Sequence, residues 1–209
     1  MLPTFLSQGG PVLWLILAAS AVAIAVVIER TLHLHRAQIN SIEFLNGVRN
    51  VLKRDNVVEA ISICDATPGP VARLVKTAIL NRENGRERVR EALEEAGLAE
   101  VPQLETKLSV LATVAQIAPL LGLLGTVLGF MDIFKQVEAS GLSANVSQLS
   151  NGIWRALICT GWGFGVAIPC YAAYNYLVSR VNAIVLDMER AASEVVHIVT
   201  DGIKPTPPS

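Results

Sequence analysis

Residues 108–131 read LSVLATVAQIAPLLGLLGTVLGFM, a stretch without a single Asp, Glu, Lys, Arg or His. Residues 11–28 and 156–179 share this property. A helix needs about 20 apolar residues to cross the ~30 Å hydrocarbon layer of a bilayer, and each stretch meets or nearly meets that length. The sequence therefore predicts an all-α, polytopic membrane protein with three transmembrane helices.

Basic residues near the ends of these stretches predict the membrane topology of the chain. Residues 1–28 contain no Lys or Arg, whereas Arg30 and Arg36 follow the first stretch and Lys107 precedes the second. The positive-inside rule then places the N-terminus outside and the C-terminus in the cytoplasm. The predicted segments are a first transmembrane helix at 1–29, a cytoplasmic helical region at 30–107, a second transmembrane helix at 108–134, a short external connection at 135–151, a third transmembrane helix at 152–179, and a cytoplasmic C-terminal helix and tail at 180–209.

Composition narrows the classes of function. The 209 residues carry a formal net charge of −1, and Lys and Arg form no basic block, so nucleic acid is not an expected partner. The three cysteines show no CxxC spacing and are interpreted as small apolar packing residues. The sequence offers no metal-ligand spacing, no cofactor motif and no nucleophile–base set, and we therefore expect neither a metal site nor an enzyme.

The polar region at 30–107 has a helical pattern with several interruptions. Short apolar stripes recur at spacings of three and four residues, which is typical of packed helices. Breaks are expected at Asn56, at the Thr-Pro-Gly-Pro of 67–70, at 84–85 and at 97–102. We expect these helices to pack on one another and on cytoplasmic extensions of the membrane helices.

The third stretch continues as an apolar seam with coiled-coil-like spacing. Val181, Val185 and Met188 begin it, and Ala192, Val195 and Val199 follow at spacings of four, three and four. Two interpretations are equally weighted. The seam either packs on helices of its own chain or forms a contact between subunits.

Small residues cluster in the second and third stretches. Gly125 and Gly129 form a GxxxG motif beside Gly122, and Gly161 and Gly165 form another. Small residues let membrane helices approach closely, which drives their association in lipid. Two such motifs in neighbouring spans predict a tightly packed assembly.

A threonine accompanies each glycine motif. Thr126 follows Gly125, and Thr160 precedes Gly161. In one interpretation each hydroxyl bonds to its own helix four residues back and has no further role. In the other, both hydroxyls line an internal cavity and bond to water or to a partner's carboxylate. The apolar stretches 11–28, 108–131 and 156–179 contain no carboxylate, so we expect any ion pathway to take its titrating group from a partner.

Three stretches carry a family resemblance. The second span reads APLLGLLGTV at 118–127, and the segment TPGPVAR occupies 67–73. The matching residues of the third span are Gly152-Ile153, Ala156-Leu157, Thr160, Val166-Ala167-Ile168-Pro169 and Tyr174-Asn175. With three spans and a large loop after the first, the chain resembles the ExbB/TolQ/MotA proton-channel family, most closely its ExbB/TolQ branch.

The resemblance implies a pentameric ring in the bacterial inner membrane, with the N-terminus and residues 135–151 in the periplasm. Five copies would surround two single-pass partner helices of the ExbD/TolR type, each with one intramembrane Asp. Thr126 and Thr160 match the family's pore-lining threonines, which face that Asp. A TonB- or TolA-like protein and lipid are further expected partners. The smooth pore wall is expected to comprise Gly122, Gly125, Gly129, Gly161, Gly165 and Pro169.

Arg155 departs from the family pattern. It stands in Gly152-Ile153-Trp154-Arg155-Ala156-Leu157, where relatives usually carry Glu. The outer mouth of the ring therefore gains a basic charge, which could pair with an acidic partner residue or with lipid phosphates. The resemblance favours protons over sodium ions as the conducted species.

Two functions remain compatible with the sequence. The leading hypothesis is a ring subunit of a motor that couples proton flow to mechanical work through an ExbD/TolR-like partner. The alternative is a passive helical scaffold that assembles other envelope proteins. An intramembrane enzyme has no candidate catalytic group.

Overall fold

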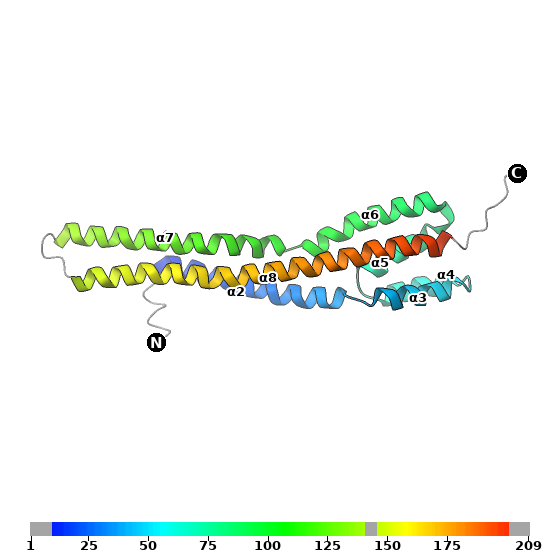
Figure 1. Cartoon of the computed structure of the whole chain (residues 1–209), viewed down its shortest axis with the longest axis horizontal. Coiled ribbons are helices and arrows are strands. Elements are labelled where there is room, and N and C mark those ends of the chain that lie inside the picture. Colours follow the sequence, from blue (N-terminus) through cyan, green and yellow to red (C-terminus); the bar gives the residue numbers. More distant parts are fainter. Residues whose placement is uncertain (1–9, 141–145, 201–209) are drawn as a thin grey trace. The chain divides into compact units, whose positions relative to one another are not determined.

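The computed structural model describes residues 10–140 and 146–200, and these residues form helices and no strand. The order along the chain is clear in Figure 1. The helices are α2 (Gly10–Ala37), α3 (Ser41–Leu52), α4 (Val57–Ala66), α5 (Pro70–Leu80), the short 3-10 helix η1 (Arg82–Asn84), α6 (Arg86–Glu105), α7 (Leu108–Ser140) and α8 (Val146–Thr200). The all-α fold expected from the sequence is confirmed.

The chain divides into two compact units. The membrane unit comprises residues 1–30 and 107–177, and the polar unit comprises 31–106 and 178–209. Helices α2 and α8 each contribute one part to either unit. The predicted tail after residue 200 and residues 141–145 of the predicted 135–151 connection lie outside the described residues.

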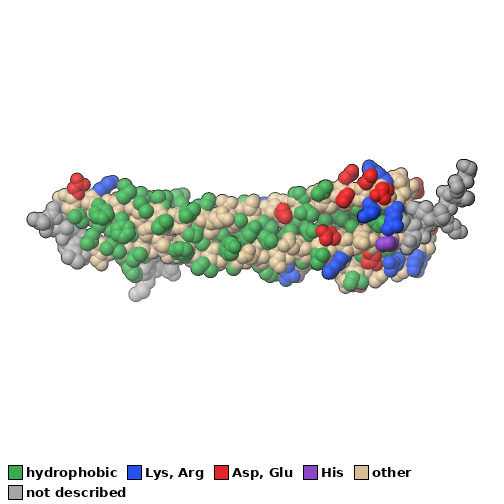
Figure 2. Space-filling model, turned by 45° about the horizontal axis from the view of Figure 1, so that its top comes forward, with side chains coloured by type: hydrophobic (Ala, Val, Ile, Leu, Met, Phe, Trp, Pro, Cys, Tyr) green, Lys and Arg blue, Asp and Glu red, His purple; other side chains and the backbone are tan. Residues whose placement is uncertain are grey.

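Three helical stretches, one each near α2, α7 and α8, are long and apolar enough to cross a membrane. The three predicted spans are thereby confirmed. Large apolar side chains remain exposed along the membrane unit, among them Trp14, Leu120 and Ile168. On the face drawn in Figure 2, hydrophobic side chains are spread along this unit, and most of the charged ones gather on the polar unit. Such an apolar surface suits lipid, and the protein is an integral membrane protein.

Local signals set most helix ends in the polar unit. The side chain of Asn40 accepts a hydrogen bond from the Glu43 N–H at the start of α3, and Asn56 does the same with Glu59 for α4. Pro70 opens α5 after Gly69, whose φ of +125° suits glycine. A Cβ on Gly69 would lie 2.9 Å from the Ala37 carbonyl oxygen, so the turn also sits tightly on the end of α2.

The breaks predicted at Asn56, 67–70 and 84–85 are confirmed, but the one at 97–102 is wrong. Helix α6 runs without interruption through Gly97 and Pro102. Pro102 has no N–H for the Leu98 carbonyl, yet Leu98 is 75% exposed, so water can satisfy that oxygen. Tertiary packing of Ala92, Leu93 and Leu104 holds the helix together across this region.

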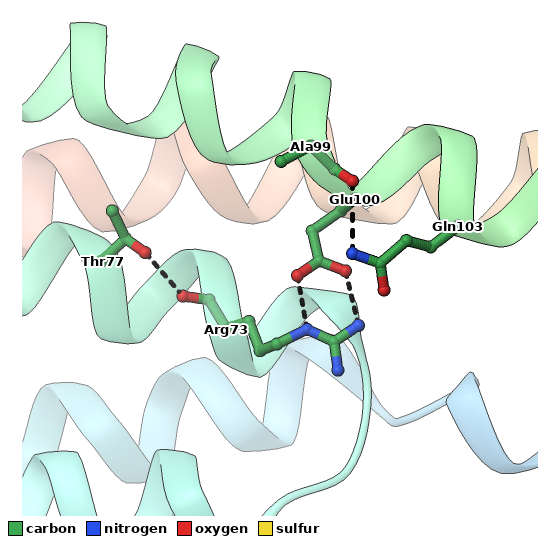
Figure 3. A network of polar contacts seen from close by, with 5 residues as sticks. All are labelled: Arg73, Thr77, Ala99, Glu100 and Gln103. Carbon is green, nitrogen blue, oxygen red and sulfur yellow. Dashed lines mark hydrogen bonds and ion pairs between the residues drawn. The ribbon is translucent and has the colours of Figure 1, made fainter.

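An ion pair joins α5 to α6 within the polar unit. The Arg73 guanidinium donates from Nε and Nη2 to the two carboxylate oxygens of Glu100, each at 2.5 Å (Figure 3). The Glu100 side chain is only 12% exposed, against 56% for Arg73. Glu100 lies inside the region where a break was expected, so the continuous helix is what carries this carboxylate to its partner.

Burial tests the predicted apolar stripes. Leu45 and Val48 of α3 are buried, as are Val71, Leu74, Val75, Ala78 and Ile79 of α5. The stripe predicted for α4 comprises Val57, Val58, Ile61 and Cys64; Cys64 is buried as expected, but Val58 is 80% exposed and Ala60 is buried in its place. A ten-residue helix offers too few turns for its pattern to select one face.

The apolar seam of α8 packs within its own chain. Val181, Met188, Val195 and Val199 are all buried in the polar unit, whereas Val185 and Ala192 are half-buried. A 3.3 Å ion pair between Arg49 of α3 and Glu194 joins the same helix to the unit. Packing on the chain's own helices therefore accounts for the buried part of the seam.

Cys64 should react slowly with alkylating reagents. The side chain is 4% exposed, and burial raises its pKa to about 11, with a smaller contribution from Asp65. The thiolate is the reactive form, so at pH 8 the folded protein should alkylate Cys64 far more slowly than the unfolded chain. Iodoacetamide labelling followed by peptide mass spectrometry measures this, and equal rates in buffer and denaturant would contradict it.

The raised pKa of Cys64 also predicts how the stability of the folded protein changes at alkaline pH. An unfolded thiol ionises near its ordinary value of 9.0, and the folded one only near a pKa of about 11. The contribution of Cys64 is therefore fully present below pH 9 and is lost as the pH rises towards 11. Cys64→Ala should remove this part of the pH dependence.

Candidate functional site

Helices α7 and α8 approach closely along a line of small residues in the membrane unit. A Cβ placed on Gly129 would lie 2.9 Å from the Ala156 Cβ, and one on Gly125 would lie 2.6 Å from the Cys159 Cβ. A Cβ on Gly122 would lie 3.0 Å from the Thr160 Cα. The residue numbers of the contacting pairs increase along α8 while they decrease along α7. The two helices therefore run antiparallel, with their backbones very close together.

Thr160 forms a hydrogen bond between helices at the centre of this contact. Its hydroxyl donates to the Gly122 carbonyl oxygen of α7 at 3.1 Å, and the residue is half-buried. A bond to its own helix was one of the two interpretations of this residue. The observed bond is to the neighbouring helix instead, and it is possible because Gly122 has no side chain to cover its carbonyl.

Thr126 makes a local bond. Its hydroxyl donates to the Leu123 carbonyl at 2.5 Å, three residues back on α7. The residue is half-buried beside the buried Gly125, so part of its surface stays open. The bond thus matches the interpretation in which the hydroxyl bonds to its own helix, here three residues back rather than four. Serine and threonine in membrane helices commonly satisfy their hydroxyls in this way.

The second GxxxG motif lies on a different side of α8. Among the described residues, a Cβ on Gly161 or Gly165 would have nothing within 4 Å, and both glycines are exposed within the chain. Pro169 is exposed too and lies inside the continuous helix. Because proline has no N–H, the Gly165 carbonyl loses its usual donor four residues on. This face, defined by Gly161, Gly165 and Pro169, is called the open face of α8.

Two glycines outside the GxxxG motifs take part in the α7–α8 contact. A Cβ on Gly163 would lie 2.7 Å from the Ala118 carbonyl oxygen and 3.0 Å from the Gly122 Cα. A Cβ on Gly152 would lie 2.5 Å from Ile133 Cγ1. Gly163 stands between the two members of a GxxxG motif in the sequence but on another face of the helix. In the sequence, this contact is indicated only by the spacing of Cys159 and Gly163, which lie four residues apart and so on one face of the helix.

Arg155 lies at one end of the same contact. It is exposed and lines a pocket with Asp132 and Gln136, both on α7. Asp132 directly follows the apolar stretch and was not singled out in the sequence. The basic charge expected at this end of the bundle is therefore accompanied by an acidic one from the same chain.

The sequence was also compared with known proteins. A model of the MotA/TolQ/ExbB proton channel family matches residues 66–190, which include both threonines and the whole α7–α8 contact. The match covers more than half of the chain. The chain belongs to this family. The resemblance seen in the sequence is thereby confirmed, and biopolymer transport recurs in the names of the relatives.

Three relatives support the ExbB/TolQ branch of the family. The chain is 27% identical over 84% of its length to a putative biopolymer transport protein ExbB homolog of Methanothermobacter thermautotrophicus. It is 35% identical over 77% of its length to a putative biopolymer transport protein ExbB-like 3 of Synechocystis. It is 26% identical over 90% of its length to the biopolymer transport protein ExbB of Neisseria gonorrhoeae.

The matched lengths differ among these relatives. The alignment covers 62% of the Methanothermobacter protein, 77% of the Synechocystis protein and 92% of the Neisseria protein. What the family supports directly is a membrane protein of the proton-channel class with a role in energy transduction. Members of this family are channel and transport proteins.

Proposed function

We propose that the chain is the ring subunit of an ion-driven motor in the bacterial inner membrane. Copies of the chain, five by analogy with the family, would surround the helices of a single-pass ExbD/TolR-like partner. Two partner copies would each supply one intramembrane Asp, and a TonB- or TolA-like protein would receive the work. The N-terminus would lie in the periplasm and the C-terminus in the cytoplasm.

The observation that carries this proposal is the open face of α8. Beyond the adjacent backbone of α8 itself, a Cβ on Gly161 or Gly165 would meet no described atom within 4 Å, and Pro169 deprives the Gly165 carbonyl of its helical donor. A bare carbonyl on an apolar helix is costly against lipid. A water-containing pore or a facing helix would satisfy it, and small residues would let a partner helix turn against the wall.

The missing carboxylate argues in the same direction. The apolar stretches at 108–131 and 156–179 contain no Asp, Glu, Lys, Arg or His. Proton relays in membranes normally use ionisable side chains, so the titrating group must come from another chain. Moving one charge across the membrane is worth about 2.3 kcal/mol per 100 mV, and several protons could drive a mechanical step.

Thr160→Val tests the role of the hydroxyls. Valine keeps the shape of threonine but leaves the Gly122 carbonyl without its 3.1 Å donor and removes a polar group from the wall. We expect proton flux in proteoliposomes that contain the chain and its partner to fall about tenfold, the equivalent of one lost hydrogen bond of about 1.4 kcal/mol. Thr126→Val should act in the same direction.

Thr113→Val is the matched control. Thr113 lies on α7 in the same apolar stretch, and its hydroxyl donates to the Ser109 carbonyl of its own helix at 2.8 Å. We expect near-normal flux from this variant. Unchanged flux in Thr160→Val, or equal losses in all three variants, would contradict the proposal.

The scaffold alternative makes a different prediction about the partner. A motor needs the partner's intramembrane Asp, so replacing it with Asn should abolish flux and activity while the complex still assembles. A passive scaffold would keep its activity. Purification of the complex before each flux measurement separates loss of assembly from loss of conduction.

A further inference from the structure

A pocket of about 280 Å³ lies among the three helices of the membrane unit. Helix α2 contributes Pro11 and Val12, and α7 and α8 contribute the rest of the lining. The polar side chains on its wall are Asp132 and Gln136 from α7 and Arg155 from α8. Leu128, Ile133, Ala156 and Cys159 form much of the apolar remainder. The wall is therefore largely apolar, with one acidic and one basic side chain among its lining residues.

The pocket lies where the apolar stretches of α7 and α8 end. Asp132 is the first residue after the apolar stretch 108–131, and Arg155 is the last before the stretch 156–179. The close contacts of Gly129 with Ala156 and of Gly152 with Ile133 fix the register of the two helices here. In this register Asp132 and Arg155 leave neighbouring helices at nearly the same height. Both charges thus flank the apolar stretches, which is where lipid headgroups are expected.

We propose that this pocket binds the headgroup of phosphatidylethanolamine, a zwitterionic phospholipid. Arg155 would hold the phosphate, since guanidinium groups donate paired hydrogen bonds to phosphate oxygens. Asp132 would accept hydrogen bonds from the primary ammonium, and the Gln136 side-chain oxygen adds a further acceptor. The apolar wall contributed by Val12, Leu128 and Ile133 would receive the glycerol end of the acyl chains.

Charge and size favour this headgroup over the other common ones. Phosphatidylglycerol offers a phosphate to Arg155 but has no cation for Asp132, which would repel its negative charge. Phosphatidylcholine has the cation, but its three methyl groups remove every N–H donor. A volume of about 280 Å³ lies at the lower limit of the roughly 300 Å³ expected for a small-molecule pocket, and it suits a headgroup better than a whole lipid.

Lipid binding to the full-length protein tests the proposal. The protein is stripped of lipid in detergent and then titrated with phosphatidylethanolamine, phosphatidylcholine or phosphatidylglycerol of identical acyl chains, and the adducts are counted by native mass spectrometry. We expect at least fivefold tighter binding of phosphatidylethanolamine than of the other two. Equal binding of the three lipids would overturn the proposal.

Two variants that each remove one charge assign the roles of these side chains. Asp132→Asn should bring phosphatidylethanolamine down to the level of phosphatidylcholine, and Arg155→Gln should weaken both. Asp187→Asn is the matched control, because Asp187 is a partly exposed carboxylate on the same α8 but in the polar unit. Preference for phosphatidylethanolamine that survives in Asp132→Asn, or disappears in Asp187→Asn, would overturn the assignment.

A soluble competitor identifies the source of the headgroup chemistry. Phosphoethanolamine carries the same phosphate and ammonium but has no acyl chains to pack on the apolar wall. At concentrations matched to the lipid it should displace less than a tenth of the bound phosphatidylethanolamine. Displacement as effective as that by the lipid itself would show a site for a small soluble ligand and would overturn the lipid assignment.

Discussion

Gly163→Ala is expected to lower the free energy of unfolding by about 1–3 kcal/mol, the usual cost of overpacking a close contact. The new methyl group would lie 2.7 Å from the Ala118 carbonyl oxygen and 3.0 Å from the Gly122 Cα. Both are backbone atoms, so no change of side-chain rotamer can relieve the clash. Helices α7 and α8 must move apart, which also lengthens the Thr160–Gly122 hydrogen bond.

Gly161→Ala is the control for this prediction. It adds the same methyl group two residues away on the same helix, where no described atom lies within 4 Å. Thermal unfolding of the two variants in detergent, followed by circular dichroism, should show a lower midpoint for Gly163→Ala alone. Equal midpoints would mean that the α7–α8 contact is looser than the structure has it.

Arg73→Met is expected to cost about 1.5–3 kcal/mol of stability, the range for a hydrogen bond to a charged group. The substitution removes both 2.5 Å donors from the Glu100 carboxylate, whose side chain is only 12% exposed (Figure 3). Water can reach a carboxylate in this position poorly, so desolvation goes uncompensated. Methionine retains most of the aliphatic length of arginine, which limits the loss of packing.

Lys76→Met provides the comparison for the same helix. The Lys76 ammonium pairs with Asp65 at 2.5 Å, but both side chains are substantially exposed, at 35% and 56%. Exposed pairs contribute about 0–1 kcal/mol. Chemical denaturation should therefore rank Arg73→Met well below Lys76→Met in stability. Equal losses of stability would indicate that burial of Glu100 has no energetic consequence. The double variant Arg73→Met/Glu100→Gln should lose less stability than Arg73→Met alone, because it leaves no buried charge without a partner.

Sequence patterns were reliable where a single segment carries the whole signal. An apolar stretch of membrane-spanning length needs no partner to be recognised, and caps such as Asn56 act within one turn of their own helix. The expected break at 97–102 failed for the opposite reason. Pro102 weakens a helix locally, but packing of Leu93 and Leu104 in the polar unit outweighs it.

The candidate site was predicted in part. Gly122, Gly125 and Gly129 lie at a close helix contact together with Gly163, whereas Gly161 and Gly165 lie on the open face of α8. A GxxxG motif predicts that one face of a helix is smooth, but it does not predict which neighbouring helix packs on that face. That choice depends on the rotation of α8 about its axis, which residues outside the motif determine.

Hydropathy and motif spacing are properties of contiguous residues, and they were enough to predict three membrane spans, a helical polar region and membership of a proton-channel family. Three features emerge only in the folded chain: Thr160 bonds to Gly122, Arg30 is buried despite its charge, and Asp132 shares a pocket with Arg155. Each of these depends on residues distant in the chain becoming neighbours. These contacts depend on the axial rotation and register of the packed helices. No local sequence pattern encodes either of them.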